Sequence, residues 1–305
     1  AGDQLDVLGH DQGWLHIHHN AQDGWVACNS TTSLAAPVPA VQPGQLSPLL
    51  QKAKLSTAEI NQARQLIHAL GNVNERGDKF EALQSKTVYR NQRDNRAIDA
   101  NGNLVETRSG QMCNLTSLAM CLDYLGIPNP HPAMQYEDAL EKVRVDNQLP
   151  ARTESNGWGG VAVKLGAKVN FLGAGASHDH QWYTNNVLPA LRAGHAMMMS
   201  ICGHIVRVQD VTNEGLIIDD PYGKGRLLPN PGCQDLKWHY ASFNEYQTPN
   251  QAVGEDNIWA WGDVSTHCMR WIAELSRPLG LPVGPQPVPA VNFSDDGIVV
   301  PGQTD

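Results

Sequence analysis

The chain has no run of about 18 apolar residues, the length that a helix needs to cross a membrane, so no membrane-spanning segment is predicted. Its start at Ala1 has neither the basic nor the apolar region of a signal peptide, so none is predicted, and the absence of an initiator Met is compatible with a processed or truncated start. Aromatic residues make up 6% and charged residues 17%, but hydrophobic residues make up 41%. With 305 residues, this composition predicts one substantial globular domain with smaller attachments.

Basic residues are also few. Lys and Arg number 22 against 31 Asp and Glu, which gives a net charge of −9. Binding to a phosphate backbone needs clustered Lys and Arg, and the densest basic stretch, from Arg90 to Arg96, is interrupted by Asn and Asp. Nucleic acid is therefore not an expected partner.

The six cysteines are spread along the chain without a CxxC pair. A disulfide scaffold would be denser and shorter, and no Cys/His set has the spacing of a structural zinc site. His16 and His18 alternate on one expected strand face without a third ligand, so no metal or cofactor is predicted. Cys121 and Cys202 lie inside apolar runs and are expected to be buried, which leaves Cys113 as the cysteine that needs another explanation.

Composition and turn residues divide the chain into four parts. Residues 1–30 alternate in the manner of short strands, and residues 29–48 have the composition of a linker. A helix follows, with a capping box of Ser56 and Glu59 and a stop at Gly71. We expect a β segment over 1–30, a linker and helical region over 31–85, a catalytic domain over 86–277 and a Pro/Gly-rich acidic tail over 278–305.

Within residues 86–277, helices are predicted first and antiparallel strands later, which indicates an α+β fold. Residues 87–89 are expected to form a short strand, followed by a polar loop over 91–110. A strong helix is expected over 114–125, where Leu recurs on one face and Gly126 follows. Further helices are expected over 136–147 and 185–193, and strands over 196–201, 205–211 and 216–219.

Cys113 directly follows a Ser-Gly-Gln-Met turn and opens the expected helix. A thiol there experiences the positive end of the helix dipole and unsatisfied backbone N–H groups, which favour the thiolate, the reactive form of cysteine. A buried structural cysteine near a helix start is the alternative. Cys113 is therefore a candidate nucleophile.

His204 is the candidate base, because it follows a Gly and opens an apolar strand, where a cleft can form; an ordinary hydrogen-bonded His is the alternative. The next strand ends in two carboxylates, Asp219 and Asp220, before Pro221, which favours extended geometry in the residue before it. Across the hairpin, Asp220 is expected to accept the imidazole N–H, as the acid of a triad does. Asp219 is the other candidate for this acid. Because side chains alternate along a strand, its carboxylate is expected on the opposite face.

The stretches YRNQRDN…SGQMCNLTSLAMCLDYLG and LRAGHAMMMSICGHIVRVQDVTNEGLIIDDPYG resemble the C39-like branch of papain-fold cysteine peptidases, over roughly residues 88–225. The resemblance implies a papain-like fold, in which a helix bearing the Cys packs on an antiparallel sheet bearing the His and Asp. It implies that Cys113 is the nucleophile, His204 the general base and Asp220 the acid that orients this base.

The same resemblance matches Gln92 to the glutamine whose amide donates to the oxyanion. Such a donor is worth about 3 kcal/mol in the transition state. Gln111, two residues before Cys113, is the competing donor. Two departures are the long loop between Gln92 and Cys113 and the presence of Asn114, where many members of the family have Gly.

The opening LDVLGHDQGWLHIHHNAQDGWVAC is similar to the second half of a bacterial SH3 domain, through its Trp anchors and Gly-Trp-Val ending. In that family, such small barrels usually attach enzymes to cell walls. The two resemblances together imply a cysteine hydrolase that cleaves peptide or amide bonds of bacterial peptidoglycan, such as a phage lysin or a secreted effector. Its expected location is outside the producing cell, in the cell wall or periplasm of a target bacterium.

The expected partners are a peptide or peptidoglycan substrate and an immunity or inhibitor protein, with neither nucleic acid nor membrane insertion. Three alternatives remain open. The first is an interbacterial toxin protease that cleaves a cytosolic protein. The second is a thiol acyltransferase or a leader-processing protease, and the third is a binding module that keeps the fold with an inactive site.

Overall fold

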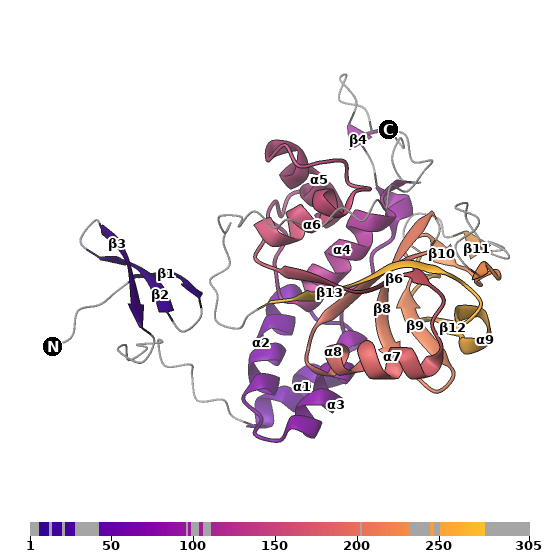
Figure 1. The fold of residues 1–305 in the computed structure, drawn as a ribbon, viewed down its shortest axis with the longest axis horizontal. Coiled ribbons are helices and arrows are strands. Elements are labelled where there is room, and N and C mark those ends of the chain that lie inside the picture. Colours follow the sequence, from indigo (N-terminus) through magenta and orange to yellow (C-terminus); the bar gives the residue numbers. More distant parts are fainter. Residues whose placement is uncertain are drawn as a thin grey trace. The chain divides into compact units, whose positions relative to one another are not determined.

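The computed structural model divides the chain into two compact units, residues 1–42 and residues 43–305 (Figure 1). It describes residues 6–11, 14–19, 22–27, 43–95, 97–98, 104–105, 111–201, 203–231, 245–246 and 251–277. Within these residues, no helix has the length and apolar character needed to cross a membrane. The acidic tail predicted over 278–305 lies outside the described residues.

The first unit is a three-stranded antiparallel sheet. Its strands are β1 (Asp6–Asp11), β2 (Trp14–His19) and β3 (Gln22–Ala27), in the order β1-β2-β3. The register shifts by one residue between Val7 and Gly9, as at a β-bulge. The strands predicted from the alternation in this segment are confirmed, and the similarity to an SH3 domain stays a prediction.

The second unit is built on a six-stranded antiparallel sheet in the order β12-β9-β8-β7-β13-β6. These strands are β6 (Lys168–Ala176), β7 (Ala196–Ile201), β8 (His204–Val211), β9 (Gly215–Asp219), β12 (Asn257–Ala260) and β13 (Met269–Ser276). Two short ladders accompany it, β4 (Ala97–Ile98) with β5 (Leu104–Val105), and β10 (Gly223–Lys224) with β11 (Glu245–Tyr246). The α+β class predicted from the sequence is confirmed.

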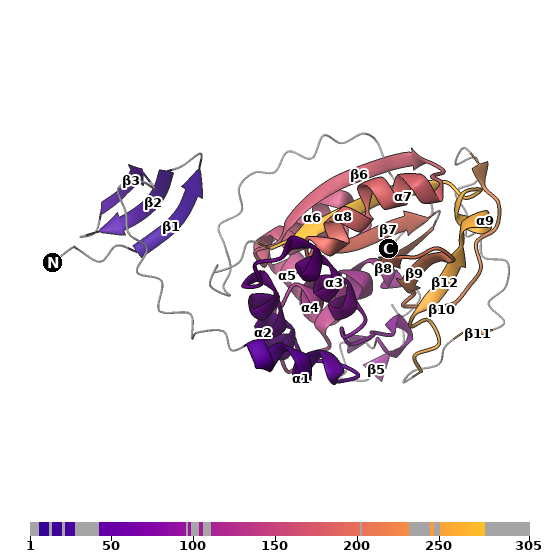
Figure 2. The ribbon, with the colours of Figure 1, turned by 90° about the horizontal axis from the view of Figure 1, so that it is seen from below.

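The helices of this unit mostly precede the central strands in the chain. They are η2 (Pro43–Gln45), α1 (Leu46–Gln51), α2 (Thr57–His68), α3 (Val73–Gln84), η3 (Gln92–Asp94), α4 (Cys113–Tyr124), α5 (Tyr136–Asp146), α6 (Ser155–Lys164), α7 (His180–Asn186), α8 (Leu188–Arg192) and α9 (Trp261–Val264). Every residue of α4 is buried, because α4 contacts β7 and β8 on one side and α2, α5 and α6 on others (Figure 2). Helix α4 is therefore the central helix of the unit.

The central strands are buried along most of their length. All six residues of β7 are buried, which is typical of a strand covered on both faces. Met199, Val206 and Ile218 pack in one cluster with Tyr183 of α7 and Leu191 of α8. Main-chain oxygens of β7 and β8 instead accept hydrogen bonds from side chains of α4. The sheet thus lies between the central helix and the pair α7 and α8.

Several predicted elements match the structure closely. The capping box is present, since the Ser56 side chain accepts from the Glu59 N–H and the Glu59 carboxylate accepts from the Ser56 N–H. The helices predicted over 114–125 and 136–147 are α4 and α5, and the strands predicted over 196–201, 205–211 and 216–219 are β7, β8 and β9. These elements carry the strongest local patterns in the sequence.

Other predictions were wrong. Residues 87–89 form no strand, because this segment is bound by side chains of other elements. Thr87 accepts from Arg207 of β8, and the Arg90 N–H donates to the sulfur of Met120 in α4 at 3.3 Å. The helix predicted over 185–193 is two helices, because Pro189 is accommodated only in the first turn of α8. The linker predicted over 29–48 ends earlier, since residues 43–51 are helical and bury Leu46.

The helical region before the core packs directly on it. Helix α2 contacts α4, and helix α3 contacts α8 and β8, so residues 43–85 belong to the same compact unit as the strands.

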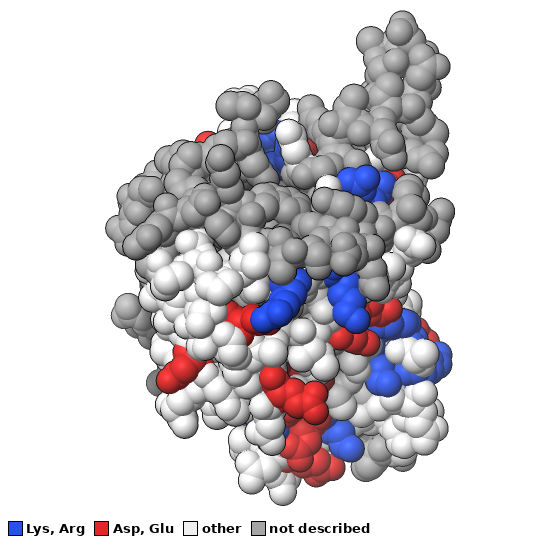
Figure 3. All heavy atoms as spheres, turned by 90° about the vertical axis from the view of Figure 1, so that its right-hand side faces the viewer, with Lys and Arg blue, Asp and Glu red and all other residues white. Residues whose placement is uncertain are grey.

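Charged side chains on the face shown in Figure 3 are of mixed sign, with Lys and Arg beside Asp and Glu. Among the ion pairs of the described residues are Arg192 with Asp78 and Arg226 with Asp263. Such exposed pairs contribute at most about 1 kcal/mol each.

Candidate active site

Cys113 is the first residue of α4, and its thiol is free. The N-cap residue, Met112, makes no side-chain capping hydrogen bond, so the positive end of the helix dipole is not met by a capping side chain there. Only 2% of Cys113 is exposed to solvent. The structure therefore places this thiol at the helix start that the sequence predicts, inside the protein.

Cys113 lies on the face of α4 that packs against the sheet. Ser117, one turn further along, donates to the carbonyl of Ile205 in β8 at 3.1 Å. Cys121, another turn on, contacts the carbonyl of Met197 in β7 at 3.5 Å. Residues four apart share a helix face, so Cys113 lies on the same face, beside the start of β8.

The start of α4 is held by Asn114 and Arg152. The Asn114 side chain donates to the Arg152 carbonyl and accepts from the Leu115 N–H at 2.8 Å. The Arg152 guanidinium donates to the main-chain oxygen of Gln111 at 3.2 Å and lies 3.4 Å from a carboxylate oxygen of Glu141. Asn114, which stands where the resemblance would place Gly, therefore has a structural role. Its side chain ties the start of the helix that carries the thiol to the main chain of Arg152.

His204 opens β8 directly after a tight turn. Its Cα partner is Ile201 at the end of β7, and Gly203 has φ +82°, a conformation that glycine adopts without steric cost. Nε2 of the imidazole lies 2.7 Å from Oδ1 of Asp220. His204 is 1% exposed and Asp220 is fully buried, so water does not screen this pair.

The pKa of His204 reports on its neighbours. Burial disfavours the charged ring, but the carboxylate of Asp220 and interaction with the sulfur of Cys113 outweigh burial and raise the pKa of His204 to about 10. The pKa of His204 therefore depends on both predicted partners, of which Asp220 is the larger influence. At neutral pH the ring is expected to carry a proton.

Asp220 is held in place beyond its bond to His204. Its Oδ1 also accepts from the Tyr222 N–H at 2.9 Å, and its own N–H donates to the carbonyl of Gly254 at 2.9 Å. The Tyr222 ring lies 6.2 Å from the His204 ring, and the Arg93 guanidinium lies over it at 5.0 Å. The Asp220 carboxylate is therefore held in one position beside the imidazole, by hydrogen bonds of both its side chain and its main chain.

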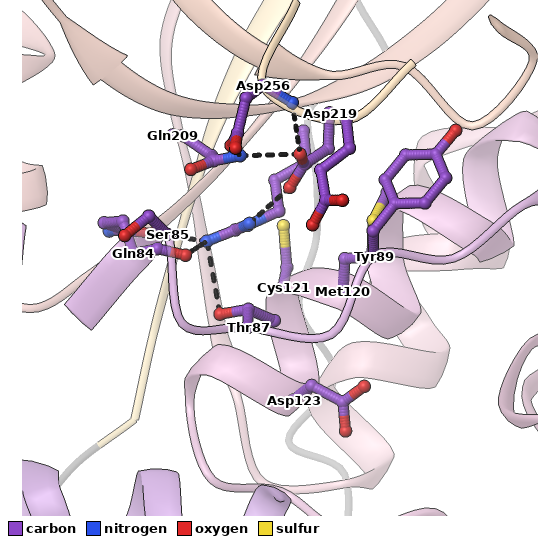
Figure 4. A network of polar contacts seen from close by, with 12 residues as sticks. Gln84, Ser85, Thr87, Tyr89, Met120, Cys121, Asp123, Gln209, Asp219 and Asp256 are labelled. Atoms are coloured by element: carbon purple, nitrogen blue, oxygen red, sulfur yellow. Dashed lines mark hydrogen bonds and ion pairs between the residues drawn. The ribbon is translucent and has the colours of Figure 1, made fainter. Parts of the chain in front are cut away.

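Asp219, the alternative candidate for the acid beside His204, has a different role. Its Oδ2 lies 2.5 Å from Nη1 of Arg207, and its Oδ1 accepts from Gln209 at 2.6 Å. Figure 4 shows this network, with Gln209 and Asp256 beside Asp219. Both Arg207 and Asp219 are buried. The two neighbouring carboxylates thus serve different partners, and only Asp220 contacts the imidazole.

Gln92 is fully buried, and its main chain is tied to the turn after Asp220. Its N–H donates to the carbonyl of Pro221 at 2.9 Å, and its carbonyl accepts from Asn95 Nδ2 at 3.0 Å. The side-chain oxygen of Gln111 is instead engaged by Arg152 at 3.2 Å. The main chain of Gln92 therefore lies at the turn after Asp220, whereas the side chain of Gln111 is engaged by Arg152.

Two residues of this region were missed by sequence reasoning. The Tyr89 hydroxyl donates to the Asp220 carbonyl at 2.6 Å, from 131 positions away. Gly254 approaches Asp220 so closely that an added Cβ would lie 2.0 Å from the Asp220 carbonyl oxygen. No local pattern marks either residue, since both contacts depend on the tertiary fold.

The remaining cysteines that the structure describes differ from Cys113. Cys121 is fully buried, and burial raises the pKa of its thiol to about 12. Cys268 is disulfide-bonded, which the sequence did not suggest, and its partner lies outside the described residues. Within the described residues, no group of three His, Cys, Asp or Glu side chains is arranged to hold a metal ion.

The Trp residues near the end of the second unit form part of its core. Trp259 and Trp271 are buried, and Trp271 stacks on Trp158 with ring centroids 5.0 Å apart. These three Trp residues belong to α6, β12 and β13.

The fold and the site define an α+β protein in which a helix-start thiol, an imidazole and a carboxylate meet at the ends of α4, β8 and β9. No protein-family model, curated protein or solved structure matches the chain.

Proposed function

We propose that the protein is a papain-like cysteine hydrolase with Cys113 as nucleophile, His204 as acid and base, and Asp220 as the orienting acid. One observation carries the proposal: the buried His204 ring has both the Asp220 carboxylate and the Cys113 sulfur as partners, and its pKa is raised. Burial alone would lower the pKa of a histidine. A buried histidine that stays protonated between a sulfur and a carboxylate is the arrangement expected for an activated thiol.

The reaction follows from these groups. The Cys113 thiolate attacks the carbonyl carbon of an amide bond, and the carbonyl π electrons move to oxygen. The imidazolium of His204 gives its proton to the leaving nitrogen as the C–N bond breaks, which releases an amine and leaves a thioester. His204 then takes a proton from water, the hydroxide attacks the thioester carbonyl, and the C–S bond breaks to regenerate the thiolate.

The charge that develops on the carbonyl oxygen needs hydrogen-bond donors. Two are proposed, the backbone N–H of Cys113 and the side-chain amide of Gln92. The N–H of the first helical residue has no partner within the helix and is available to an anion. Gln92 is held next to the acid by its bond to Pro221. Removing one such donor typically costs about 10²- to 10³-fold in kcat.

The proposed substrate is a peptide or amide bond of bacterial peptidoglycan. This assignment rests on the resemblances to the C39-like branch of papain-fold peptidases and to the SH3 domain. The proposed place of action follows from it: outside the producing cell, at the wall of a target bacterium, with an immunity or inhibitor protein as a possible partner. The chemistry of the site supports amide cleavage, and substrate choice depends on surfaces beyond the triad.

Mass spectrometry tests this proposal. Purified muropeptides and a panel of bacterial proteins are incubated with the wild type, with Cys113→Ala and with Cys121→Ala. Cys121 is a matched control, since it is a second free thiol on the same helix. We expect muropeptide cleavage by the wild type and Cys121→Ala but not by Cys113→Ala. Cleavage of proteins alone would indicate a toxin protease, and products that survive in Cys113→Ala would exclude the proposed nucleophile.

A further inference from the structure

The main chain of Asp220 is held by two residues that are distant in the sequence. The Tyr89 hydroxyl donates to this oxygen at 2.6 Å, while the Asp220 N–H donates to Gly254 at 2.9 Å. The close approach of Gly254 leaves no room for a side chain between the two chain segments. The main chain of Asp220 is therefore fixed on both its donor and its acceptor side by residues outside β9.

Tyr89 itself belongs to a segment that is anchored on α4. The Arg90 N–H contacts the Met120 sulfur at 3.3 Å, and the Arg90 guanidinium donates to Asp123 at 2.9 Å. Both partners lie on the helix that begins with Cys113. Two residues further on, Gln92 donates its N–H to Pro221 at 2.9 Å. Residues 89–92 therefore connect the helix of the thiol to the turn of the acid.

This connection matters for the imidazole. The orientation of the Asp220 carboxylate depends on the position of its main chain, and the carboxylate in turn holds Nε2 of His204. A small displacement of the turn would lengthen a charge-assisted hydrogen bond inside a buried site, where electrostatic interactions are strong. The Tyr89 hydroxyl is the side-chain donor that limits this displacement from the α4 side.

We propose that Tyr89 is a positioning residue of the site: its hydroxyl fixes the Asp220 main chain and thereby the His204 imidazole opposite Cys113. Tyr89 touches none of the reacting atoms in this proposal. The inference rests on the proposed function for its effect on activity, but its effect on the His204–Asp220 pair is independent of any substrate.

The test compares Tyr89→Phe with Tyr136→Phe in the full chain. Tyr136 is a matched control, because its hydroxyl also donates to a main-chain carbonyl, that of Ile127 at 2.9 Å, without contacting the triad. The His204 titration is followed by NMR and assigned by the resonance that is lost in His204→Gln. We expect Tyr89→Phe to lower the pKa of His204 by about one unit, which is a tenfold change in proton affinity, and Tyr136→Phe to leave it unchanged.

The activity of both variants is measured on the substrate that the wild type cleaves. Tyr89→Phe is expected to lower kcat about tenfold with little change in KM, while both variants lose similar thermal stability, since each loses one hydrogen bond of the same kind. An unchanged His204 titration in Tyr89→Phe would overturn the inference even if activity depends on Cys113. A shifted titration without any Cys113-dependent hydrolysis would keep the inference and reject the proposed function.

Discussion

His204 turns Nε2 toward Asp220, with 2.7 Å between Nε2 and Oδ1, and this leaves Nδ1 as the ring nitrogen available to Cys113. In the serine-protease triad the roles are reversed, with the acid on Nδ1 and the nucleophile beside Nε2. Because Nδ1 lies nearer the main chain, the nucleophile must lie close to the start of β8. The hydrogen bond from Ser117 to Ile205 provides this proximity by packing α4 against β8.

Replacement of Asp220 by Asn should move the alkaline limb of the pH–rate profile to lower pH. The Asp220 carboxylate raises the pKa of His204, so its loss should lower this pKa and deprotonate the imidazolium at lower pH. We also expect kcat to fall by up to about 10⁴-fold. The measurement is kcat/KM against pH for both proteins.

Asp219→Asn is the control for that experiment. It should leave the alkaline limb where it is and lower the free energy of unfolding by about 3 kcal/mol, because Arg207 loses its buried partner. Denaturant unfolding measures the second effect. If Asp219→Asn shifts the limb and Asp220→Asn does not, the roles of the two carboxylates have been assigned in the wrong order.

The pH dependence of stability should carry the sign of a raised histidine pKa. The pKa of His204 rises from an ordinary value of 6.5 to about 10 on folding, so the folded state binds the proton more tightly than the unfolded state. This contribution is complete below about pH 6.5 and is lost as pH rises toward 10. The Tm difference between the wild type and His204→Gln should therefore shrink between pH 6 and 10. A constant difference would contradict the raised pKa.

Cys113 should be the first free thiol to react with iodoacetamide. Cys121, the other free thiol of the described residues, is fully buried and its pKa is raised to about 12, so its thiolate is scarce. Peptide mapping after brief alkylation at neutral pH distinguishes the two sites. Asp220→Asn should slow the reaction at Cys113, because the imidazolium partner is weakened. Equal labelling of both cysteines in the native protein would argue against an activated thiol.

Gln92→Ala should lower kcat by about 10²- to 10³-fold with little effect on KM, because an oxyanion donor acts mainly in the transition state. Gln111→Ala serves as the comparison, since the side chain of Gln111 is engaged by Arg152. A smaller loss is expected there. Should Gln111→Ala lose more activity than Gln92→Ala, the oxyanion donor would be Gln111.

The site elements were predictable from the sequence because their signals are local. Cys113 begins a helix, His204 begins a strand after a glycine, and Asp220 precedes a proline. The roles of Asp219 and Asp220 were separable for the same reason, since alternate residues of a strand face opposite sides. Strand β8 and the turn after β9 therefore lie where the patterns indicate.

Other parts of the fold depended on tertiary contacts. Helix α3 was missed because its residues are mostly polar, although Asn72 caps it by accepting from Asn74 and Glu75. The run over 259–275 combines two strands and a short helix, so no single periodicity describes it. The Tyr89–Asp220 contact joins positions 131 residues apart, which no local pattern predicts.

The pairing of Arg207 with Asp219 also has a consequence for how the chain folds. If β9 slipped by one residue against β8, Asp220 would face the guanidinium and the imidazole would meet a different side chain. Such a slip would turn the Asp219 carboxylate away from the buried Arg207 and the Asp220 carboxylate away from His204. The two adjacent carboxylates therefore specify the register of β9, because only the observed alignment gives both His204 and Arg207 their present acidic partners.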